Sequence, residues 1–467
     1  MTDLTEATHV PHPEYDRQAI RVGIVHFGLG NFHRAHQAMY LDRLMTAGMG
    51  QDWGICGVGT RPADRRMQQV LEDQSYLYTL VLKSGIGEPS PTIIGSIVDH
   101  LMAADDRDAV LERLSDPGVR IVSLTITEGG YRRGGPPAEG SVDVFDLIAE
   151  GLEARRTAGV QPFTVMSCDN LPHNGDAARR AVVDAAGRRE QELADWVDRA
   201  VAFPNSMVDR ITPVTTEEDR ELVRTRFGLD DDWPVPAEPF AQWVLEDHFT
   251  LGRPPLEEAG VQLVADVAPF ELMKLRLLNA SHQAMAYSGI LLGHSSVAAA
   301  AGDPLVEEFL RRYMAEARPT LPPVPDTDVS AYAESLLERF RNPAIADTLE
   351  RLATDSANRL AAFLVPVVLD NLRAGRPVSA STAVLACWVH ACANTVGDAQ
   401  PQVPSALRAA ASAASEDPTG FAEEVDILQP VVGYPEFRTA LARDIASIRD
   451  RGVRAFLEGV ASEPGFR

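Results

Sequence analysis

The sequence predicts an α/β protein with an N-terminal Rossmann-type doubly wound sheet and a mainly α-helical C-terminal domain. From residue 21 onward, short β-rich runs alternate with helical patterns, an order typical of a largely parallel sheet. Beyond Pro269 the pattern changes to long helices. The chain has 467 residues, more than one hydrophobic core usually accommodates. We therefore expect two domains, residues 1–265 and residues 266–467.

Each expected strand is a short apolar run followed by turn residues. In chain order, the strands cover residues 22–27, 53–58, 77–82, 121–126 and 163–167. Amphipathic patterns between them predict helices at residues 35–45, 61–72, 107–114 and 142–158. Residues 131–141, rich in Gly, Arg and Pro, predict a surface loop. In the second domain, helices are expected at residues 306–314, 348–372, 380–393 and 437–456.

The composition favours a small-molecule partner. The chain has 67 acidic and 43 basic residues and a net charge of -24, which disfavours nucleic acid and anionic membranes as partners. Its four cysteines are too few for a disulfide framework and suit a reducing cytosol. The N-terminus lacks the apolar run of a signal peptide, and no stretch approaches the ~20 apolar residues of a membrane span. We expect a cytoplasmic protein that acts as a monomer on a small molecule, without nucleic acid or membrane.

A glycine turn follows the first expected strand, in a G-x-G-x-x-H frame that runs from Gly28 to His33. Its two glycines would allow a tight turn and a close approach of the backbone to a pyrophosphate at the start of a helix. His33 stands where a dinucleotide-binding motif has its third glycine. An ordinary glycine turn would give the same pattern, but the position after the first strand favours dinucleotide binding. We therefore expect Gly28, Gly30, Asn31 and Phe32 to bind the dinucleotide.

Asp64 is the expected reader of the adenosine ribose. The second strand ends without an acid, and Asp64 is the nearest acid after it. A carboxylate there would bind the ribose hydroxyls and favour NAD. Arg61, Arg65 and Arg66 surround it and could instead accept the 2′-phosphate of NADP. NAD is the expected cofactor, with tolerance of NADP left open.

Lys274 is one of only two lysines, and arginine supplies the rest of the 43 basic residues. Arginine stays protonated at ordinary pH, so lysine is expected where a basic side chain must lose its proton. Lys274 opens a K-x4-N-x2-H pattern with Asn279 and His282, on a predicted helix that starts at Pro269. At ~100° per residue the three lie near ~0°, ~140° and ~80°, within one broad face. In a cleft this amine would serve as a general base, although a helix with a snorkelling lysine and a core histidine would show the same spacing.

Polar clusters follow two further strands, at residues 125–131 and 167–175. Open α/β sheets bind their ligands at the carboxyl ends of the strands, and an amide there could donate to a developing alkoxide. Turn chemistry alone would also explain these Asn, Gly and Pro residues. No His-Glu-x-x-His motif occurs, and Cys387, His390 and Cys392 lie in a pattern typical of a core helix, so no metal site is expected.

Five motifs in this order resemble those of the polyol-specific long-chain dehydrogenases. They are the run GxGxFHRAH that begins at Gly28, the runs TEGGY, SCDNLPHNG and FPNSMVDR, and the K-x4-N-x2-H pattern. The resemblance covers most of the chain. It implies a metal-independent NAD(P) enzyme with a Rossmann-type domain, a helical domain and a cleft between them, which oxidises a polyol secondary alcohol to a ketose and catalyses the reverse.

The resemblance also implies catalytic roles for four residues of these motifs. Lys274 would be the general base. Asn170 and Asn279 would form an oxyanion hole for the alcohol oxygen, and His282 would orient that oxygen.

Four further residues would serve the substrate. Asp209 and Arg351 would hold substrate hydroxyls, and Glu128 would line the path by which the proton leaves Lys274. Arg359 would be a fourth substrate contact, although it stands where the family usually has a lysine.

Two alternatives remain open at this point. A sugar-acid reductase of the fructuronate or tagaturonate type shares the scaffold, and Arg351 and Arg359 could hold its carboxylate. A non-catalytic NAD-sensing protein would keep the cofactor site alone, which the complete set of a base and two amides disfavours.

Overall fold

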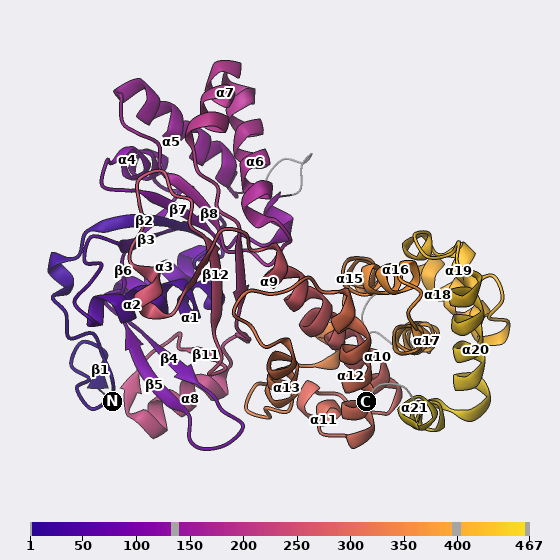
Figure 1. Cartoon of the computed structure of the whole chain (residues 1–467). Helices are drawn as coiled ribbons and strands as arrows, with labels where there is room; N and C mark the ends of the chain where they lie inside the picture. Colours follow the sequence, from indigo (N-terminus) through magenta and orange to yellow (C-terminus); the bar gives the residue numbers. More distant parts are fainter. Residues whose placement is uncertain (1, 132–139, 395–402, 463–467) are drawn as a thin grey trace. The chain divides into compact units, whose positions relative to one another are not determined.

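The computed structural model describes residues 2–131, 140–394 and 403–462. It divides into two compact units, Met1–Ala268 and Pro269–Arg467 (Figure 1). Most of the surface loop expected at residues 131–141 lies outside the described residues.

The first unit is built around a five-stranded parallel sheet with the order β6-β3-β2-β7-β8. The strands are β2 (Val22–Phe27), β3 (Gly54–Gly59), β6 (Ile97–Met102), β7 (Ile121–Leu124) and β8 (Thr164–Ser167). In the register, Val25 pairs with Cys56 on one side and with Val122 on the other. The strand order reverses at β2, so the carboxyl ends of β2 and β7 form the switch point at which such sheets bind ligands. The predicted Rossmann-type sheet is confirmed.

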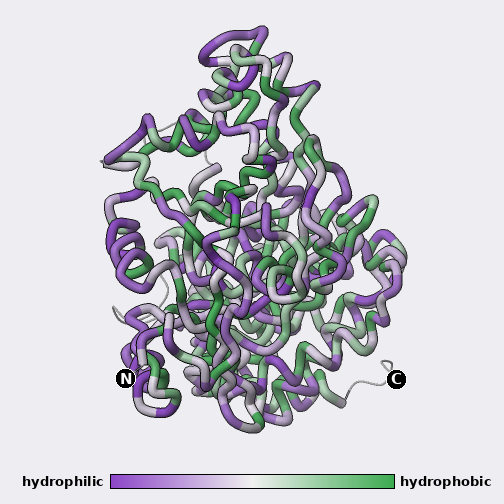
Figure 2. The backbone as a smooth tube through the Cα atoms, turned by 90° about the vertical axis from the view of Figure 1, so that its left-hand side faces the viewer, coloured by the Kyte–Doolittle hydropathy of each residue, from purple (hydrophilic) through white to green (hydrophobic). Residues whose placement is uncertain are grey.

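Both faces of this sheet are buried. Successive side chains of a strand point to opposite faces, so consecutive apolar residues along a strand supply apolar side chains to both faces. Val25 and Val122 pack on one face, and Ile24 and Ile121 on the other. The first face is covered by α4 (Arg107–Ser115), α5 (Val144–Ala158), α6 (Asn174–Arg189) and α7 (Gln191–Ala200). The second face packs against α2 (Gln37–Thr46) and α3 (Asp64–Asp73). Figure 2 shows hydrophilic and hydrophobic residues alternating along the outer helices, as expected for helices with one buried side.

Smaller sheets complete the first unit. One has the order β11-β4-β5 and another the order β13-β12-β9. The remaining elements of this unit are β1 (Thr2–Asp3), η1 (Arg17–Ala19), α1 (Asn31–Ala35), β4 (Tyr78–Leu82), β5 (Ser90–Ile94), η2 (Glu128–Tyr131), β9 (Ser206–Asp209), α8 (Glu217–Phe227), β10 (Leu229–Asp230), β11 (Val235–Ala237), β12 (Gln242–Glu246), η3 (Leu256–Ala259) and β13 (Gln262–Val264). The strand expected at residues 77–82 forms β4, which lies outside the parallel sheet. Its place at the sheet edge is taken by β6, whose apolar run is interrupted by Asp99 and His100.

The second unit is helical in the part that the structure describes, as predicted. Its helices are α9 (Ala268–Met273), α10 (Ala280–Leu291), α11 (Val297–Ala301), α12 (Pro304–Ala317), α13 (Val329–Phe340), α14 (Leu349–Ala353), α15 (Ser356–Phe363), α16 (Val365–Arg373), α17 (Ser379–Ala393), α18 (Ser405–Glu416), α19 (Phe421–Glu424), α20 (Pro435–Arg451) and α21 (Val453–Ser462). A π-helical turn, η4 (Lys274–Asn279), lies between α9 and α10, and a short 3-10 turn, η5 (Arg318–Thr320), follows α12.

Two helices that were expected to be continuous are broken. The helix expected at residues 348–372 forms α14, α15 and α16. Asp355, with φ 55°, interrupts it before α15, and Pro366 lies in the first turn of α16, where its missing N–H needs no partner. The helix expected at residues 437–456 forms α20 and α21, which are separated at Gly452.

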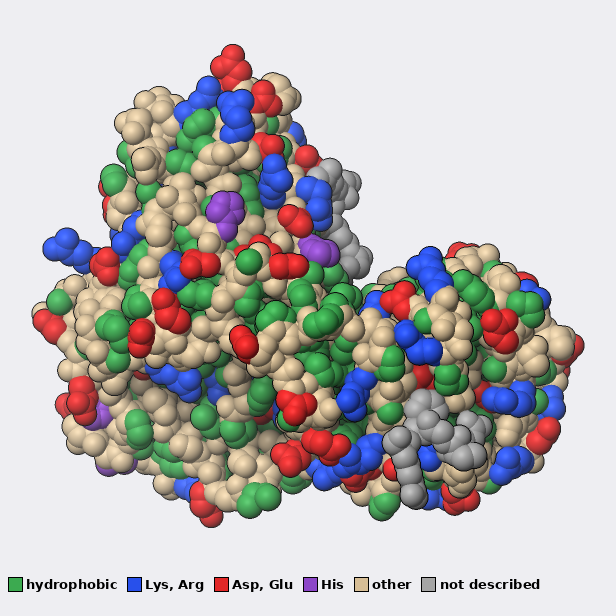
Figure 3. Space-filling view, in the orientation of Figure 1, with side chains coloured by type: hydrophobic (Ala, Val, Ile, Leu, Met, Phe, Trp, Pro, Cys, Tyr) green, Lys and Arg blue, Asp and Glu red, His purple; other side chains and the backbone are tan. Residues whose placement is uncertain are grey.

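Charged side chains of both signs are interspersed on the surface (Figure 3). Several are paired, as where Arg179 contacts Asp198 at 2.8 Å. Such exposed pairs contribute little to stability. Among the described residues, Ile86 and Val214 are the exposed large hydrophobic side chains.

Candidate active site

The turn after β2 requires glycine at its first position. Gly28 has φ 92°, and a Cβ there would lie 2.2 Å from the backbone oxygen of Thr125, which follows β7. Gly30 has φ -92°, and the atom nearest to a Cβ there would be the Gly28 oxygen at 3.9 Å. The fold therefore explains Gly28, whereas the open space at Gly30 suits the close approach of a pyrophosphate to the backbone. The turn lies at the switch point of the sheet, so its residues fit a dinucleotide.

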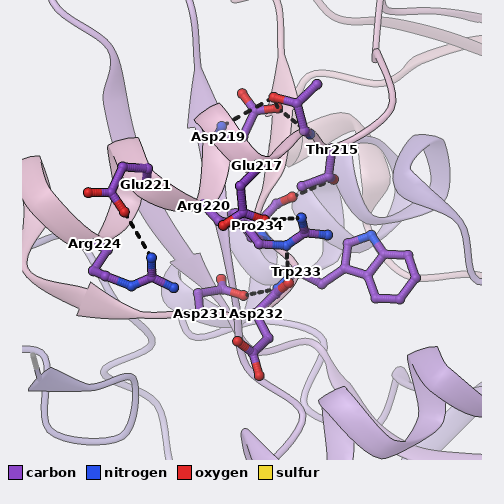
Figure 4. A network of polar contacts seen from close by, with 11 residues as sticks. Thr215, Glu217, Asp219, Arg220, Glu221, Arg224, Asp231, Asp232, Trp233 and Pro234 are labelled. Atoms are coloured by element: carbon purple, nitrogen blue, oxygen red, sulfur yellow. Dashed lines mark hydrogen bonds and ion pairs between the residues drawn. The ribbon is translucent and has the colours of Figure 1, made fainter.

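The side chain of Asn31 is bound to the protein. Its amide nitrogen donates to the Pro213 oxygen (3.0 Å) and to the Thr215 hydroxyl (2.9 Å), and its oxygen accepts from Arg34 (2.8 Å). The Thr215 hydroxyl donates in turn to the Pro234 oxygen at 2.7 Å, within the polar network around α8 that Figure 4 shows. Asn31 therefore fixes the glycine turn, and its backbone N–H is the group that could meet a dinucleotide.

His33, in place of the third glycine, is buried and stacks on His26 with 3.4 Å between the ring centroids. His26 is held by Ser123 (2.8 Å) and Thr125 (2.9 Å), which lie on and just after β7. Burial lowers the pKa of His26 to about 3 and the pKa of His33 well below its usual value. Two neutral imidazoles thus join α1 to the sheet, a contact that a third glycine would make by close packing. Phe32, which is half-buried, stacks on His36 with 5.0 Å between centroids.

Asp64 opens α3, just beyond the carboxyl end of β3. Its carboxylate accepts the backbone N–H groups of Thr60 and Arg61, each at 3.0 Å, and pairs with the Arg61 guanidinium at 2.9 Å. It therefore stands after the second strand, as a ribose-binding acid should, but it also holds its own turn.

The three arginines around Asp64 are already engaged. Arg61 pairs with Asp64, Arg65 pairs with Asp105, and the guanidinium of Arg66 lies 5.3 Å from the centre of the Trp233 ring. A 2′-phosphate would have to compete with these contacts, which favours NAD over NADP.

Asp169 ties the ends of β7 and β8 together. Its buried carboxylate accepts the Thr127 N–H at 2.7 Å and the Tyr131 hydroxyl at 2.8 Å, and burial raises its pKa. Thr127 has φ 65°, a strained conformation for a β-branched residue, which these contacts maintain. Asn170 is the next residue and is exposed, whereas the side chain of Glu128 lies outside the described part of the chain. Sequence inspection gave Asp169 no role, and its only signal was an acid beside Asn170.

Two of the sequence motifs bind each other. The Asn174 amide donates to the backbone oxygens of Asp169 (3.0 Å) and Ser206 (2.8 Å) and accepts the Ser206 N–H (2.9 Å). Ser206 opens β9, which ends at Asp209, a residue only 4% exposed. Arg210, the next residue, donates to the backbone oxygen of Ala35 in α1 at 2.6 Å. These contacts link the segment after β8, which carries Asn170, to β9, which carries Asp209, and link the end of β9 to α1, which follows the glycine turn.

In the second unit, Lys274 and Asn279 are the first and last residues of η4. The Ala280 N–H donates to the Leu275 oxygen, five residues back, where an α-helix would use the Arg276 oxygen. In an α-helix, Asn279 would be turned ~140° from Lys274, whereas i→i+5 bonding places it one turn along the same side. The angular arrangement that the sequence predicted is therefore corrected. Both side chains are nearly buried, with 7% and 8% exposed.

His282 lies on α10, three residues beyond Asn279 and hence about one α-helical turn further on. Its ring is 4.8 Å from the ring of Phe340 on α13. Lys274, Asn279 and His282 therefore follow one another along one side of the helix.

The two predicted substrate arginines differ in their surroundings. Arg351, on α14, has an exposed guanidinium that pairs with Asp347 at 2.5 Å. Arg359, on α15, is half-buried and donates to the Leu352 oxygen at 3.3 Å. The same oxygen accepts from Gln283 of α10 at 3.1 Å. This shared carbonyl connects Arg359 to the helix that carries His282.

Within the described residues, no group of three or more His, Cys, Asp or Glu side chains could hold a metal ion. Cys387 and Cys392 are buried on α17, and His390 between them contacts the Ile445 oxygen at 2.9 Å. In the part of the chain that the structure describes, none of the helices has the length and the apolar composition of a membrane-spanning segment.

Comparison with known proteins covers nearly the whole chain. Residues 22–258 match the profile of the mannitol dehydrogenase Rossmann domain, and residues 266–449 match that of the mannitol dehydrogenase C-terminal domain. A mannitol 2-dehydrogenase of Cereibacter sphaeroides is 45% identical over 433 residues, which cover 88% of this chain and 90% of the relative. The solved mannitol 2-dehydrogenase of Pseudomonas fluorescens, a ternary complex with NAD and D-mannitol, is 41% identical with a TM-score of 0.84 over 98% of both chains. A D-sorbitol dehydrogenase in substrate-free form is 34% identical with a TM-score of 0.88, over 96% of this chain and 98% of that one.

Proposed function

The chain belongs to the mannitol dehydrogenase family, and we propose that it oxidises a secondary alcohol of a polyol to a ketose with NAD and catalyses the reverse reduction. We propose a reaction of the mannitol-to-fructose type. The relatives that support it act on mannitol or sorbitol according to their names, which favours a polyol over a sugar acid and an enzyme over an NAD sensor.

The observation that carries this proposal is the pairing of a buried lysine with an amide on one π-helical turn. Lys274 is 7% exposed, and Asn279 lies one turn along the same side of the helix. An amine can lose its proton where a guanidinium cannot, which is the property that a general base requires. The π-turn is also a feature that occurs frequently at functional sites.

In the proposed reaction, neutral Lys274 accepts the proton of the substrate hydroxyl. The hydrogen on the carbon that bears this hydroxyl leaves with its electron pair as hydride, and the C–O single bond becomes a carbonyl. NAD, bound at the turn after β2, supplies the acceptor for that hydride. The side-chain amides of Asn170 and Asn279 donate to the alcohol oxygen as negative charge develops on it. His282 orients this oxygen. In the reverse direction, protonated Lys274 returns the proton to the carbonyl oxygen.

The other predicted residues are proposed to serve the substrate. Asp209 binds a hydroxyl, which its buried position at the end of β9 supports. Arg351 and Arg359 bind further hydroxyls, and Glu128 lines the proton path. Of the two arginines, Arg359 has the closer tie to the helix of His282, through the Leu352 carbonyl.

The absorbance of the reduced nicotinamide tests the proposed function directly. The purified protein would be assayed with mannitol, arabitol, sorbitol and sugar acids, with NAD and NADP, before and after dialysis against EDTA. We expect polyol oxidation with NAD that survives chelation. Turnover of sugar acids alone, or a loss of activity that Zn²⁺ restores, would contradict the proposal.

The two lysines provide a matched test of the general base. Lys274→Arg keeps a positive charge but removes the titrating amine, so oxidation should fall by ~10² to 10⁴ while NAD binding persists. Lys83→Arg is the control, because Lys83 pairs with Asp219 and arginine can keep that ion pair. A Lys274→Arg enzyme with turnover close to the wild type would exclude Lys274 as the base.

We also propose that the protein acts as a monomer in the cytoplasm. Its exposed large hydrophobic side chains within the described residues, Ile86 and Val214, are single residues and form no extended apolar patch. All four cysteines are free thiols, which suits a reducing compartment. Light scattering coupled to size-exclusion chromatography would measure the mass in solution, and a dimer would contradict the first part.

A further inference from the structure

A π-helical turn removes the regular hydrogen-bond donor from one of its carbonyls. In η4, the Ala280 N–H is bound to the Leu275 oxygen and so is not bound to the Arg276 oxygen, its partner in an α-helix. Arg276 is buried. A carbonyl of a buried residue that loses its α-helical donor is stabilised by a replacement donor from another part of the fold.

Tyr313 supplies that donor. It lies on α12, its side chain is fully buried, and its hydroxyl donates to the Arg276 oxygen at 2.9 Å. Burial raises the pKa of Tyr313 well above its usual value, so the hydroxyl keeps the proton that it donates. The hydrogen bond favours the π-helical form of the turn, because in an α-helix the Tyr313 hydroxyl would have to share the Arg276 carbonyl with the Ala280 N–H.

The side chain of Arg276 anchors the same turn a second time. Its guanidinium donates to the Thr320 oxygen at 2.7 Å and pairs with Asp370 of α16 at 2.8 Å. The backbone of Arg276 is thus held by α12 and its side chain by η5 and α16. Three elements outside the helix fix the residue in the middle of the segment that Lys274 and Asn279 delimit.

From these contacts we infer that Tyr313 is a positioning residue for the reaction: its hydroxyl maintains the π-helical turn that places Lys274 and Asn279 on the same side of the helix. The inference rests on the proposed roles of those two residues. Tyr313 acts through the turn and not by contact with the reacting atoms. Without its hydroxyl the turn relaxes towards an α-helix, and Asn279 rotates away from the side of Lys274.

The variant Tyr313→Phe tests this role, because it removes the hydroxyl oxygen and keeps the ring. We expect kcat for polyol oxidation to fall by on the order of 10- to 100-fold, as when a catalytic group is slightly misplaced. The dissociation constant for NAD should not change. The pH at which kcat reaches half its maximum should shift, because the surroundings of Lys274 change. Hydrogen–deuterium exchange should become faster in residues 274–281.

Tyr287→Phe is the matched control. Tyr287 is also fully buried, but its hydroxyl donates to the Gln283 side chain at 2.5 Å and not to the π-turn. This variant should lose a similar amount of thermal stability and keep the wild-type kcat and pH profile. Equal losses of kcat in both variants would mean a general effect of stability and would overturn the positioning role.

Two further variants keep the inference testable and separate it from the proposed function. If Tyr313→Phe does not fold, Asp370→Asn weakens the second anchor at a less buried position and should also speed exchange in residues 274–281 and lower kcat. In a Lys274→Ala background, Tyr313→Phe should cause a smaller loss of kcat than in the wild type, because only the part of its effect that runs through Asn279 is left. A wild-type enzyme that oxidises no polyol would overturn the proposed function, and an active Lys274→Ala enzyme would exclude Lys274 as the base. Suppose that Lys274→Ala is inactive but that Tyr313→Phe keeps the kcat, the pH profile and the hydrogen–deuterium exchange of the wild type. This result would overturn only the positioning role of Tyr313.

Discussion

The Asp64 carboxylate holds its own turn, so a test of its role towards the cofactor has to preserve that turn. Asparagine keeps an oxygen for the N–H groups of Thr60 and Arg61 but removes the charge. We expect Asp64→Asn to raise kcat/KM with NADP relative to NAD by about tenfold, or ~1.4 kcal/mol, because repulsion of the 2′-phosphate is lost and Arg61 is released. Steady-state kinetics with both nucleotides would measure this ratio. Asp73→Asn, at the exposed end of the same helix, is the control, and an unchanged ratio in Asp64→Asn would assign the ribose to another residue.

The two proposed oxyanion donors make a second prediction at the residue scale. Replacement of Asn170 or Asn279 by Ala should lower kcat by ~10² or more, because each amide donates to charge that develops mainly in the transition state. The double variant should lose less than the product of the two effects, because both amides serve one oxygen. Turnover numbers of the three variants decide the matter. An effect confined to KM would show that the amide only binds the ground state.

At the scale of the element, the two glycines of the turn after β2 have different predicted roles, one in stability and the other in binding NAD. Ala at position 28 would meet the Thr125 oxygen and adopt φ 92°, so Gly28→Ala should lose at least ~1–2 kcal/mol of stability from the backbone alone. Gly30→Ala has open space and should change stability by less than about 0.5 kcal/mol. It should nevertheless weaken NAD binding at least about tenfold, because its methyl group keeps the pyrophosphate from the backbone.

Calorimetric unfolding and titration with NAD would measure the two effects for each glycine variant. Equal NAD affinity in the wild type and in Gly30→Ala would mean that the pyrophosphate does not approach this turn.

At the scale of the whole molecule, buried neutral histidines should make the protein sensitive to acid. Burial lowers the pKa of His26 to about 3 and of His100 to about 4, from 6.5 in the unfolded chain. At a pH between the folded pKa of each histidine and 6.5, the unfolded state binds more protons than the folded state. The free energy of unfolding is therefore unaffected by these histidines above about pH 6.5 and decreases as the pH falls towards their folded pKa values. Each such histidine should contribute a slope of up to ~1.4 kcal/mol per pH unit within its window.

Denaturant unfolding between pH 7 and pH 4 would measure this slope. His100→Gln should reduce the slope by the contribution of about one proton. An identical slope in the wild type and in His100→Gln would contradict the prediction.

Local and repetitive features of the sequence were sufficient for the fold class, the strand β2 at residues 22–27 and the helical second half, because apolar periodicity reflects burial directly. The glycine turn and the K-x4-N-x2-H pattern were equally visible as candidate site residues. Their roles remain predictions, since each depends on where a substrate lies.

The tertiary structure alone decided three features, each by contacts between residues that are far apart in the sequence. The β4 strand pairs with β5 and β11 and leaves the parallel sheet, because a strand's partner is chosen by the whole fold and not by its own apolar run. Asp169 links the ends of β7 and β8, because its carboxylate accepts hydrogen bonds from Thr127 and Tyr131. The helix of Lys274 takes a π-helical turn because Tyr313, on another helix, binds the carbonyl that this turn releases. Periodicity reports which side of a helix is buried, but the hydrogen-bond register of the backbone depends on groups that only tertiary packing brings to it.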